Sequence, residues 1–354
     1  MKKLNYLFSF AAIAFAMCMV SCDNVDNPAE PDEPVVPEQK IHDGDDLATA
    51  IAQYCDVIEG VPTLTLPAGV SVVLNEPFEV NTPLSIKGDA TDPAKIKIGE
   101  GGRFIGGLQI MNVVIDASDM ANPLFTFGTE DAEEWKFDHV GLINVTMTGL
   151  KKALVFSGCK NYDVSLVVEN SLIQVAADVT VFDFTKGSFP IFFNISNSTF
   201  WASEATSKSF FSSQSGQKAT DMEGGTETFE FENSTFYNLA KSKNFFTHRQ
   251  SNQTWLSYIV KDCIFVNCGK SGQTIKGMNG GQSGKNPTWD ITGNVFNFDG
   301  ADTSADESTG DEDEPVKDSK TVVVDFVDPA NGDFSQGVVK AGDPTWFIAD
   351  PAKW

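Results

Sequence analysis

Three charged residues, Asp183, Arg249 and Lys276, lie on or just beyond a short apolar run that recurs along the chain. Abstraction of a proton beside a carboxylate needs a base, for which Lys or Arg can serve, and a cation that neutralises the carboxylate. Arg249 and Lys276 could therefore act in a lyase reaction on a uronic acid, with Asp183 as a ligand of the cation. The alternative, which we favour, is that all three are solvated residues on an outer face.

Four aromatic residues could instead bind a sugar. Trp201 and Tyr237 each directly follow the last apolar position of a repeated unit, so strand alternation points both outward, one above the other. Such a pair can stack on the apolar faces of sugar rings. Trp135 and Trp255 lie in loops of variable length and could do the same. The alternative for Trp201 and Tyr237 is a surface pair covered by a folded-back loop or by the C-terminal tail.

The repeated unit that must position these residues occurs seven times, and its clearest copy is FNISNSTF at 193–200. Apolar residues stand four and two positions before a central residue and three positions after it, and a mostly small residue directly follows it. The copies recur at intervals of roughly thirty residues, which is typical of a solenoid. The central residues are Asn112, Asn144, Asn170, Asn197, Asn233, Asp262 and Gly293.

The spacing of two predicts a strand with one buried face, and Asn, Asp and Gly tolerate left-handed backbone angles at least cost. Each unit is therefore a strand, a one-residue bend and a second strand. We expect the bend asparagines to stack as a ladder of side-chain amides. A helical repeat would need apolar residues three or four apart, and the chain is instead rich in Phe, Val, Ile and Thr.

A third apolar run follows each unit and completes a coil. Three short strands per turn predict an all-β fold, a single-stranded parallel β-helix of about nine coils. A short helix is expected at 45–54, where Asp45 or Asp46 can cap it. The third runs are 124–127, 154–156, 181–184, 210–211, 245–246 and 274–275.

The N-terminus reads as an export signal. Lys2 and Lys3 precede an apolar stretch at 7–20 that is too short to span a membrane comfortably. The stretch ends in MVSC, which resembles the lipobox of bacterial lipoproteins with Met in place of the usual Leu, so Cys22 is the expected lipidation site. The acidic, Pro-rich residues that follow predict an extended tether. We expect a protein anchored by lipid in the outer membrane and facing the cell exterior.

The residues after the tether carry a family resemblance. The expected helix, the Leu-Pro-Ala-Gly of 66–69 and the Leu-Ser-Ile-Lys-Gly of 84–88 resemble the opening of pectate-lyase-like proteins, and the likeness extends to about residue 298. It implies a right-handed β-helix, as the crossover rule does. The ending at 328–346 looks like that of bacterial surface lipoproteins of unknown function. The expected divisions are a signal peptide at 1–21, a tether at 22–41, the β-helix at 42–298, an acidic disordered insertion at 299–319, and a closing strand and tail at 320–354.

The known enzymes of this superfamily do not transfer residue by residue. The chain has no Asn-Thr-Asp, Asp-Asp and Gly-His-Gly set of the polygalacturonases, and no Arg-x-Pro-x-x-Arg of the pectate lyases. The net charge of −24 at pH 7 argues against nucleic acid and polyanionic substrates. We find no Cys or His spacing typical of a metal site and expect no cofactor, with calcium as the alternative if the protein were a lyase.

These observations favour a non-catalytic surface lipoprotein that binds polysaccharide or assists glycan capture. Its membrane contact would be through the lipid alone. Two alternatives remain open: a polysaccharide lyase or glycoside hydrolase with a diverged active site, and a structural or adhesive surface protein.

Overall fold

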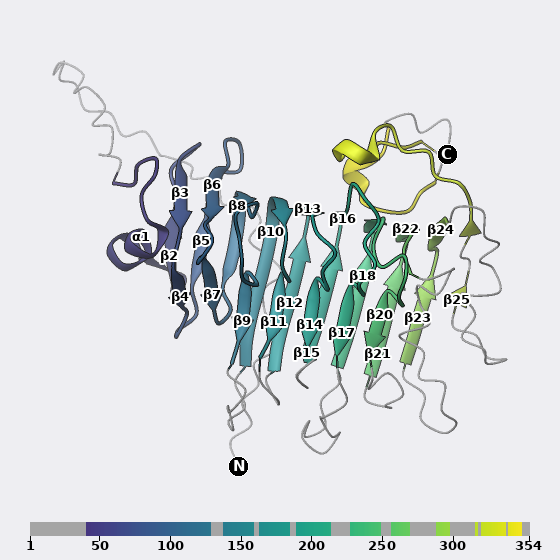
Figure 1. The fold of residues 1–354 in the computed structure, drawn as a ribbon, viewed down its shortest axis with the longest axis horizontal. Coiled ribbons are helices and arrows are strands. Elements are labelled where there is room, and N and C mark those ends of the chain that lie inside the picture. Colours follow the sequence, from purple (N-terminus) through teal and green to yellow (C-terminus); the bar gives the residue numbers. More distant parts are fainter. Residues whose placement is uncertain are drawn as a thin grey trace, which may run out of the picture. The chain divides into compact units, whose positions relative to one another are not determined.

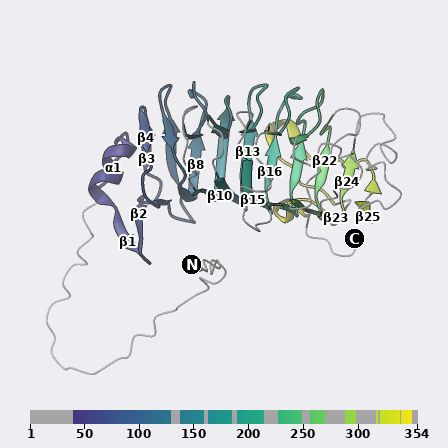
Figure 2. The ribbon, with the colours of Figure 1, turned by 90° about the horizontal axis from the view of Figure 1, so that it is seen from below.

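The computed structural model describes residues 40–128, 137–158, 163–184, 189–213, 227–248, 256–269, 288–297, 316–317, 320–337 and 339–348. They belong to one compact unit, 39–354. The predicted all-β parallel β-helix with a short N-terminal helix is confirmed. Figures 1 and 2 show the strands succeeding one another side by side from α1 onward.

The helix forms at the predicted place. α1 spans Leu47–Tyr54, and its first turn is capped by Asp46, whose carboxylate accepts a hydrogen bond from the Thr49 N–H. Its apolar face, which includes Leu47 and Ile51, joins the core of the first coils. Next to it, β1 (Asp56–Ile58) pairs antiparallel with β2, whereas the other strand pairings described are parallel.

Nineteen of the described strands form one large sheet with two arms. β8 and β10 run through both arms. The first arm contains β2 (Val61–Thr65), β5 (Ser85–Lys87), β8 (Gln109–Asp116), β10 (Phe137–Leu150), β12 (Asp163–Glu169), β15 (Phe189–Ser196), β18 (Glu227–Glu232), β21 (Leu256–Lys261), β23 (Thr288–Thr292) and β25 (Val316–Lys317). The second arm contains β3 (Ser71–Leu74), β6 (Ala94–Ile98), β13 (Leu172–Val175), β16 (Thr199–Trp201), β19 (Thr235–Tyr237), β22 (Ile264–Val266), β24 (Val295–Asn297) and β26 (Lys320–Thr321).

A second sheet of seven strands closes each coil. Five of its strands lie at the predicted third apolar runs, and the run at 274–275 lies outside the described residues. The strands are β4 (Pro77–Glu79), β7 (Arg103–Ile105), β9 (Phe125–Phe127), β11 (Val155–Ser157), β14 (Phe182–Phe184), β17 (Phe211–Ser213) and β20 (Phe246–His248).

The bend between the two arms has the predicted left-handed backbone in every copy. The φ angle is 53° at Asn144, 46° at Asn197 and 72° at Gly293, and the other four central residues also have positive φ. Parallel pairing places these residues on successive coils, as the register of β8 with β10 shows for Asn112 and Asn144. The bend column predicted from the sequence is therefore confirmed.

The expected ladder of asparagine amides is largely replaced by another ladder. Among the contacts of the described residues, the one amide rung between bend residues is Asn144 Nδ2 to Asn112 Oδ1 at 2.8 Å. The continuous ladder runs one residue later, inside the coil. There the Ser171 N–H donates to Ser198 Oγ at 3.1 Å, and the Ser198 N–H donates to Ser234 Oγ at 3.2 Å.

Residues other than serine take part in the ladder at both of its ends. The Val145 N–H donates to Ser171 Oγ, and the Cys263 N–H donates to Asn294 Oδ1 at 3.0 Å. Burial raises the pKa of the Cys263 thiol, which stays protonated and points at the Lys261 carbonyl 3.3 Å away. Ser171, Ser198, Ser234 and Asn294 thus each supply an acceptor for a buried N–H of the preceding coil.

In the last four units, stacked phenylalanine rings occupy the last apolar position and fill the core. Phe236 lies 5.0 Å from Phe265 between ring centroids, and Phe265 lies 5.4 Å from Phe296, with each pair nearly parallel. These rings are buried to at least 98%. Cys55, Cys263 and Cys268 are free, and Cys263 and Cys268 are kept apart by β22, which lies between them.

A test of the inner ladder uses two serines of one strand-bend-strand unit. Ser198→Ala leaves the buried Ser171 N–H without its acceptor, so we expect the free energy of unfolding to fall by about 1–3 kcal/mol. Half-buried Ser196, whose hydroxyl donates outside the coil to Asn194 Oδ1 at 3.3 Å, provides the control. Ser196→Ala should change stability by no more than about 0.5 kcal/mol. Equal losses in chemical unfolding would contradict a special role for the ladder.

Candidate functional site

The first arm presents a strip of mostly polar side chains on its outer face, in which Ile259 lies between Glu230 and Asp290. Strand alternation directs these side chains outward, because neighbours such as Ile195, Phe231 and Val260 are fully buried in the core. All members of the strip are half-buried and come from β15, β18, β21 and β23. We call this strip the polar row: Asn194, Glu230, Glu232, Lys261, Asp290 and Thr292.

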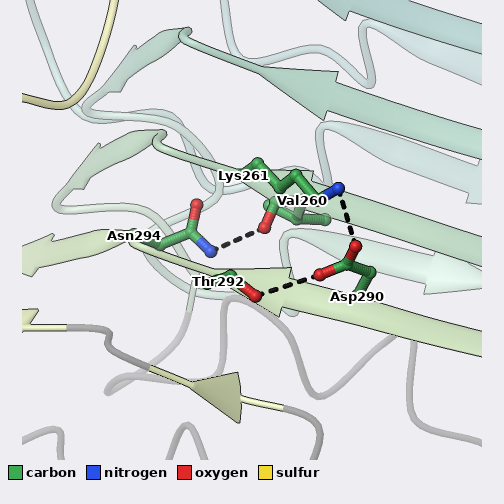
Figure 3. A network of polar contacts seen from close by, with 5 residues as sticks. All are labelled: Val260, Lys261, Asp290, Thr292 and Asn294. Carbon is green, nitrogen blue, oxygen red and sulfur yellow. Dashed lines mark hydrogen bonds and ion pairs between the residues drawn. The ribbon is translucent and has the colours of Figure 1, made fainter.

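The polar row is cross-linked between coils. Asn194 Nδ2 donates to Glu230 Oε2 at 3.3 Å across one coil boundary, and Lys261 Nζ lies 2.6 Å from Asp290 Oδ2 across another. Thr292 Oγ1 donates to Asp290 Oδ1 at 3.0 Å (Figure 3). These contacts hold oxygen and nitrogen atoms of several coils in fixed positions on one face.

Charge within the row decides which chemistry it can perform. The hydrogen bond and the charge of Asp290 raise the pKa of Lys261, so this amine remains an ammonium and is not a base at neutral pH. Burial, followed by the charge of Glu230, raises the pKa of Glu232. The two glutamates stand two residues apart on one face of β18. Two neighbouring carboxyl groups can serve different roles when the environment shifts the pKa of one of them, as it does for Glu232.

The second arm carries the aromatic pair, and its exposure differs from the expectation. Trp201 and Tyr237 are directly paired between β16 and β19, so the predicted stacking on adjacent coils is confirmed. The expected open platform is not found, because Trp201 is only 6% exposed and Tyr237 is half-buried. The physical reason is the alternative noted above, in which the C-terminal tail folds back over the pair.

We call residues 322–348, with 338 outside the described residues, the C-terminal segment. It includes two short 3-10 helices, Pro329–Asn331 and Pro344–Trp346. Figure 1 shows the segment, in yellow, beside β16 and β22. Its Val324 and Ala341 form a small second core with Ile264, Val266 and Val295, which point outward from the second arm. β25 lies within the predicted acidic insertion, and the rest of that insertion is outside the described residues.

Polar contacts attach the C-terminal segment to β16 and β19, the strands that carry Trp201 and Tyr237. Thr199 Oγ1 donates to Asp343 Oδ2 at 2.8 Å and accepts from the Trp346 indole N–H at 2.8 Å. The Asp343 N–H donates to Thr235 Oγ1 at 3.0 Å. Asp343 is 4% exposed, and its side chain also caps the helix at 344–346 by accepting from the Thr345 N–H.

The other residues predicted for a site are dispersed. Asp183 lies on β14 of the second sheet, paired with Phe156 and Ser212 on adjacent strands, and so is not part of the polar row. The remaining candidates, Trp135, Trp255, Arg249, Lys276 and Cys22, lie outside the described residues. In the described ranges, no group of three or more His, Cys, Asp or Glu side chains could hold a metal ion.

Sequence reasoning missed the polar row and the Thr199–Asp343 contact. The signal for the row was available, because its members occupy the positions three and one before the bend, which alternate with the inward residues. No such signal existed for Asp343, which lies 144 residues from Thr199 along the chain.

Residues 74–203 match a family described as a domain of unknown function (DUF4957). The match runs from the end of β3 to just beyond β16, so it includes Asn194 and Trp201 but not the rest of the polar row. No curated protein matches the chain. Among the described helices, none is long and apolar enough to cross a membrane.

The docking of the C-terminal segment should depend on pH through Asp343. Burial raises the pKa of this carboxyl. Between the ordinary Asp value of about 3.9 and the raised value, the docked state therefore binds more protons than the undocked state. Docking should be strongest below about pH 4 and weaken as the pH rises through the raised pKa. Amide exchange of residues 322–348, measured at several pH values, gives the slope of docking stability against pH.

The control for this prediction is Asp343→Asn, which keeps the size of the side chain and removes its charge. The slope should disappear in this variant. A wild-type slope of the opposite sign, or one that survives in the variant, would show that other groups control docking.

Proposed function

We propose that this protein is a lipid-anchored surface protein whose β-helix binds a polysaccharide through the polar row without cleaving it. The observation that carries the proposal is the polar row itself, in which half-buried hydrogen-bonding side chains of adjacent coils are held by Asn194–Glu230 and Lys261–Asp290 contacts. Pre-ordered side chains lose little conformational entropy when a ligand binds.

The spacing and charge of the row suit a hydroxyl-rich polymer. Adjacent strands are about 4.8 Å apart, so an extended chain lying along the stack would meet a new set of polar atoms at each coil. Glu230, Glu232 and Asp290 are acceptors for sugar hydroxyls, and hydrogen bonds to charged groups are the stronger ones. The net charge of −24 favours a neutral glycan over a polyanionic one.

Binding fits the row better than lyase chemistry does. A lyase needs an unprotonated base beside the sugar carbon, and the ion pair with Asp290 keeps Lys261 protonated. Hydrolysis is the second candidate, because Glu230 and Glu232 form a carboxyl pair in which the pKa of Glu232 is raised. A purely structural surface protein is the third and would show no glycan binding.

A glycan array with the protein lacking residues 1–22 tests the proposal. We expect binding to a neutral polysaccharide, and we expect Glu230→Ala with Asp290→Ala to weaken it at least tenfold, which corresponds to about 1.4 kcal/mol. Glu79→Ala is the matched control, because Glu79 is an exposed carboxylate on β4 of the other sheet. Its affinity should equal that of the unmodified protein.

Two results would contradict the proposal. The first is the absence of binding to any neutral polysaccharide, and the second is full affinity in the double variant. Chromatography of the bound glycan after incubation separates binding from hydrolysis. Shortened products that disappear in Glu232→Gln would replace the binding proposal with the hydrolase.

The proposed anchor has its own test in cells of a Gram-negative bacterium. Cys22→Ser removes the thiol that the lipobox-like MVSC would expose for lipidation. The unaltered full-length chain should incorporate a clickable fatty-acid label and enter the detergent phase, and the variant should do neither. Cys55→Ser is the control, because this cysteine follows α1 in the folded unit. Equal labelling of unaltered chain and C22S variant would refute the anchor.

A further inference from the structure

The aromatic pair has an occupant that belongs to the same chain. Phe334 is fully buried, and its ring centroid lies 5.9 Å from that of Trp201 and 5.5 Å from that of Tyr237. Its ring is inclined at 64° to each of them. One apolar ring of the C-terminal segment therefore contacts two rings that adjacent coils hold in register.

The indole N–H of Trp201 is left without a partner beneath this cover. Trp201 is only 6% exposed, and its Nε1 has no hydrogen-bond partner among the described residues. The neighbouring Trp346 differs, because its indole N–H donates to Thr199 Oγ1. A buried donor without an acceptor costs about 1–3 kcal/mol.

The C-terminal segment lies against the benzene ring of the Trp201 indole, beside the atom that bears Nε1. A Cβ atom added to Gly332 would lie 3.0 Å from Trp201 Cζ2 and 3.5 Å from Cε2, the ring atom bonded to Nε1. Gly332 also has a φ angle of +86°, where a side chain is strained. The segment therefore places a glycine against the side of the indole next to Nε1, and none of the described residues accepts a hydrogen bond from this N–H.

We propose that Trp201 and Tyr237 form a second, concealed binding site for a neutral sugar ring, which Phe334 occupies as an intramolecular substitute. This inference rests on the proposed glycan binding. A sugar ring would place its apolar face on the aromatic pair, and one of its oxygens would accept the hydrogen bond of Trp201 Nε1. The C-terminal segment provides the apolar contact, through Phe334, but no acceptor for the Trp201 Nε1 hydrogen bond.

The cover has two parts that are held by different contacts, so one part can open while the other stays in place. Val324 and Ala341 are buried against the second arm and stay in place in the proposal. The part over Trp201 contacts Trp346, whose ring centroid lies 5.8 Å from that of Phe334. Trp346 belongs to the short helix capped by Asp343, a buried carboxylate whose partners, the Thr199 hydroxyl and the Thr345 N–H, are neutral. A buried charge without a counter-charge weakens docking.

Two glycines of the segment provide a matched experiment in the folded protein without its first 22 residues. Gly332→Ala should push the segment away from Trp201, because the new methyl group meets the indole at a strained φ. Gly337→Ala is the control, since a Cβ there meets nothing within 4 Å. We expect faster acrylamide quenching of tryptophan emission in G332A and unchanged quenching in G337A.

Calorimetry with neutral hexasaccharides, namely cellohexaose, maltohexaose and mannohexaose, then measures binding. One of them should bind G332A at least tenfold more tightly than the unaltered protein, and adding Trp201→Ala should remove the gain. A galacturonic acid hexasaccharide should show no gain. Circular dichroism establishes that each variant keeps its β-structure, and Phe334→Ala offers a second way of opening the cover if G332A does not fold.

The inference is overturned by quenching that rises without any gain in affinity, or by a gain that survives Trp201→Ala. It is also overturned if neither G332A nor F334A exposes Trp201, because the cover is then a permanent part of the fold. The proposed function fails separately, through the Glu230 and Asp290 variants, in which the aromatic pair is intact.

Discussion

The structure depends on how each coil satisfies the backbone around its left-handed bend. A single residue with positive φ, such as Asn197, interrupts strand pairing and leaves a buried N–H group at the next residue without a regular partner. The side chain at the same position of the following coil accepts that hydrogen bond, as Ser198 does for Ser171 and Ser234 does for Ser198. The bend and the side chain after it therefore act together, and they fix the register of every coil on the next.

Register then determines which side chains share a face. The same pairing that stacks Phe236 on Phe265 inside the coil aligns Asn194 with Glu230 outside it. It also places Trp201 beside Tyr237 on the second arm. The two arms consequently offer different surfaces, one polar and half-buried, the other apolar and covered by the C-terminal segment. This difference bears on function, because the fold alone is compatible with several functions.

Much of the fold was predictable because its information is local and repeated. Asn144 and Asn197 indicate the bend because asparagine tolerates a positive φ angle, and period-two alternation identifies the inward residues. A second bend at Asn238 and Asn267, both with positive φ and joined by an amide hydrogen bond of 3.0 Å, was missed because it occurs in too few coils to stand out. A cover over Trp201 by the C-terminal tail was one of the two interpretations of the sequence, but the contacts that dock residues 322–348 on β16 and β19 were not predictable, since they join distant parts of the chain.

Amide hydrogen exchange of the residue that follows each bend tests the central claim most directly. The N–H groups of Val145, Ser171, Ser198 and Cys263 donate to side chains of the next coil. Measured by NMR, they should exchange as slowly as the amides of the flanking strands, at rates governed by unfolding of the whole stack. Exchange at the rates of exposed loops would contradict the account, because the coils would then not be held in register by these bonds.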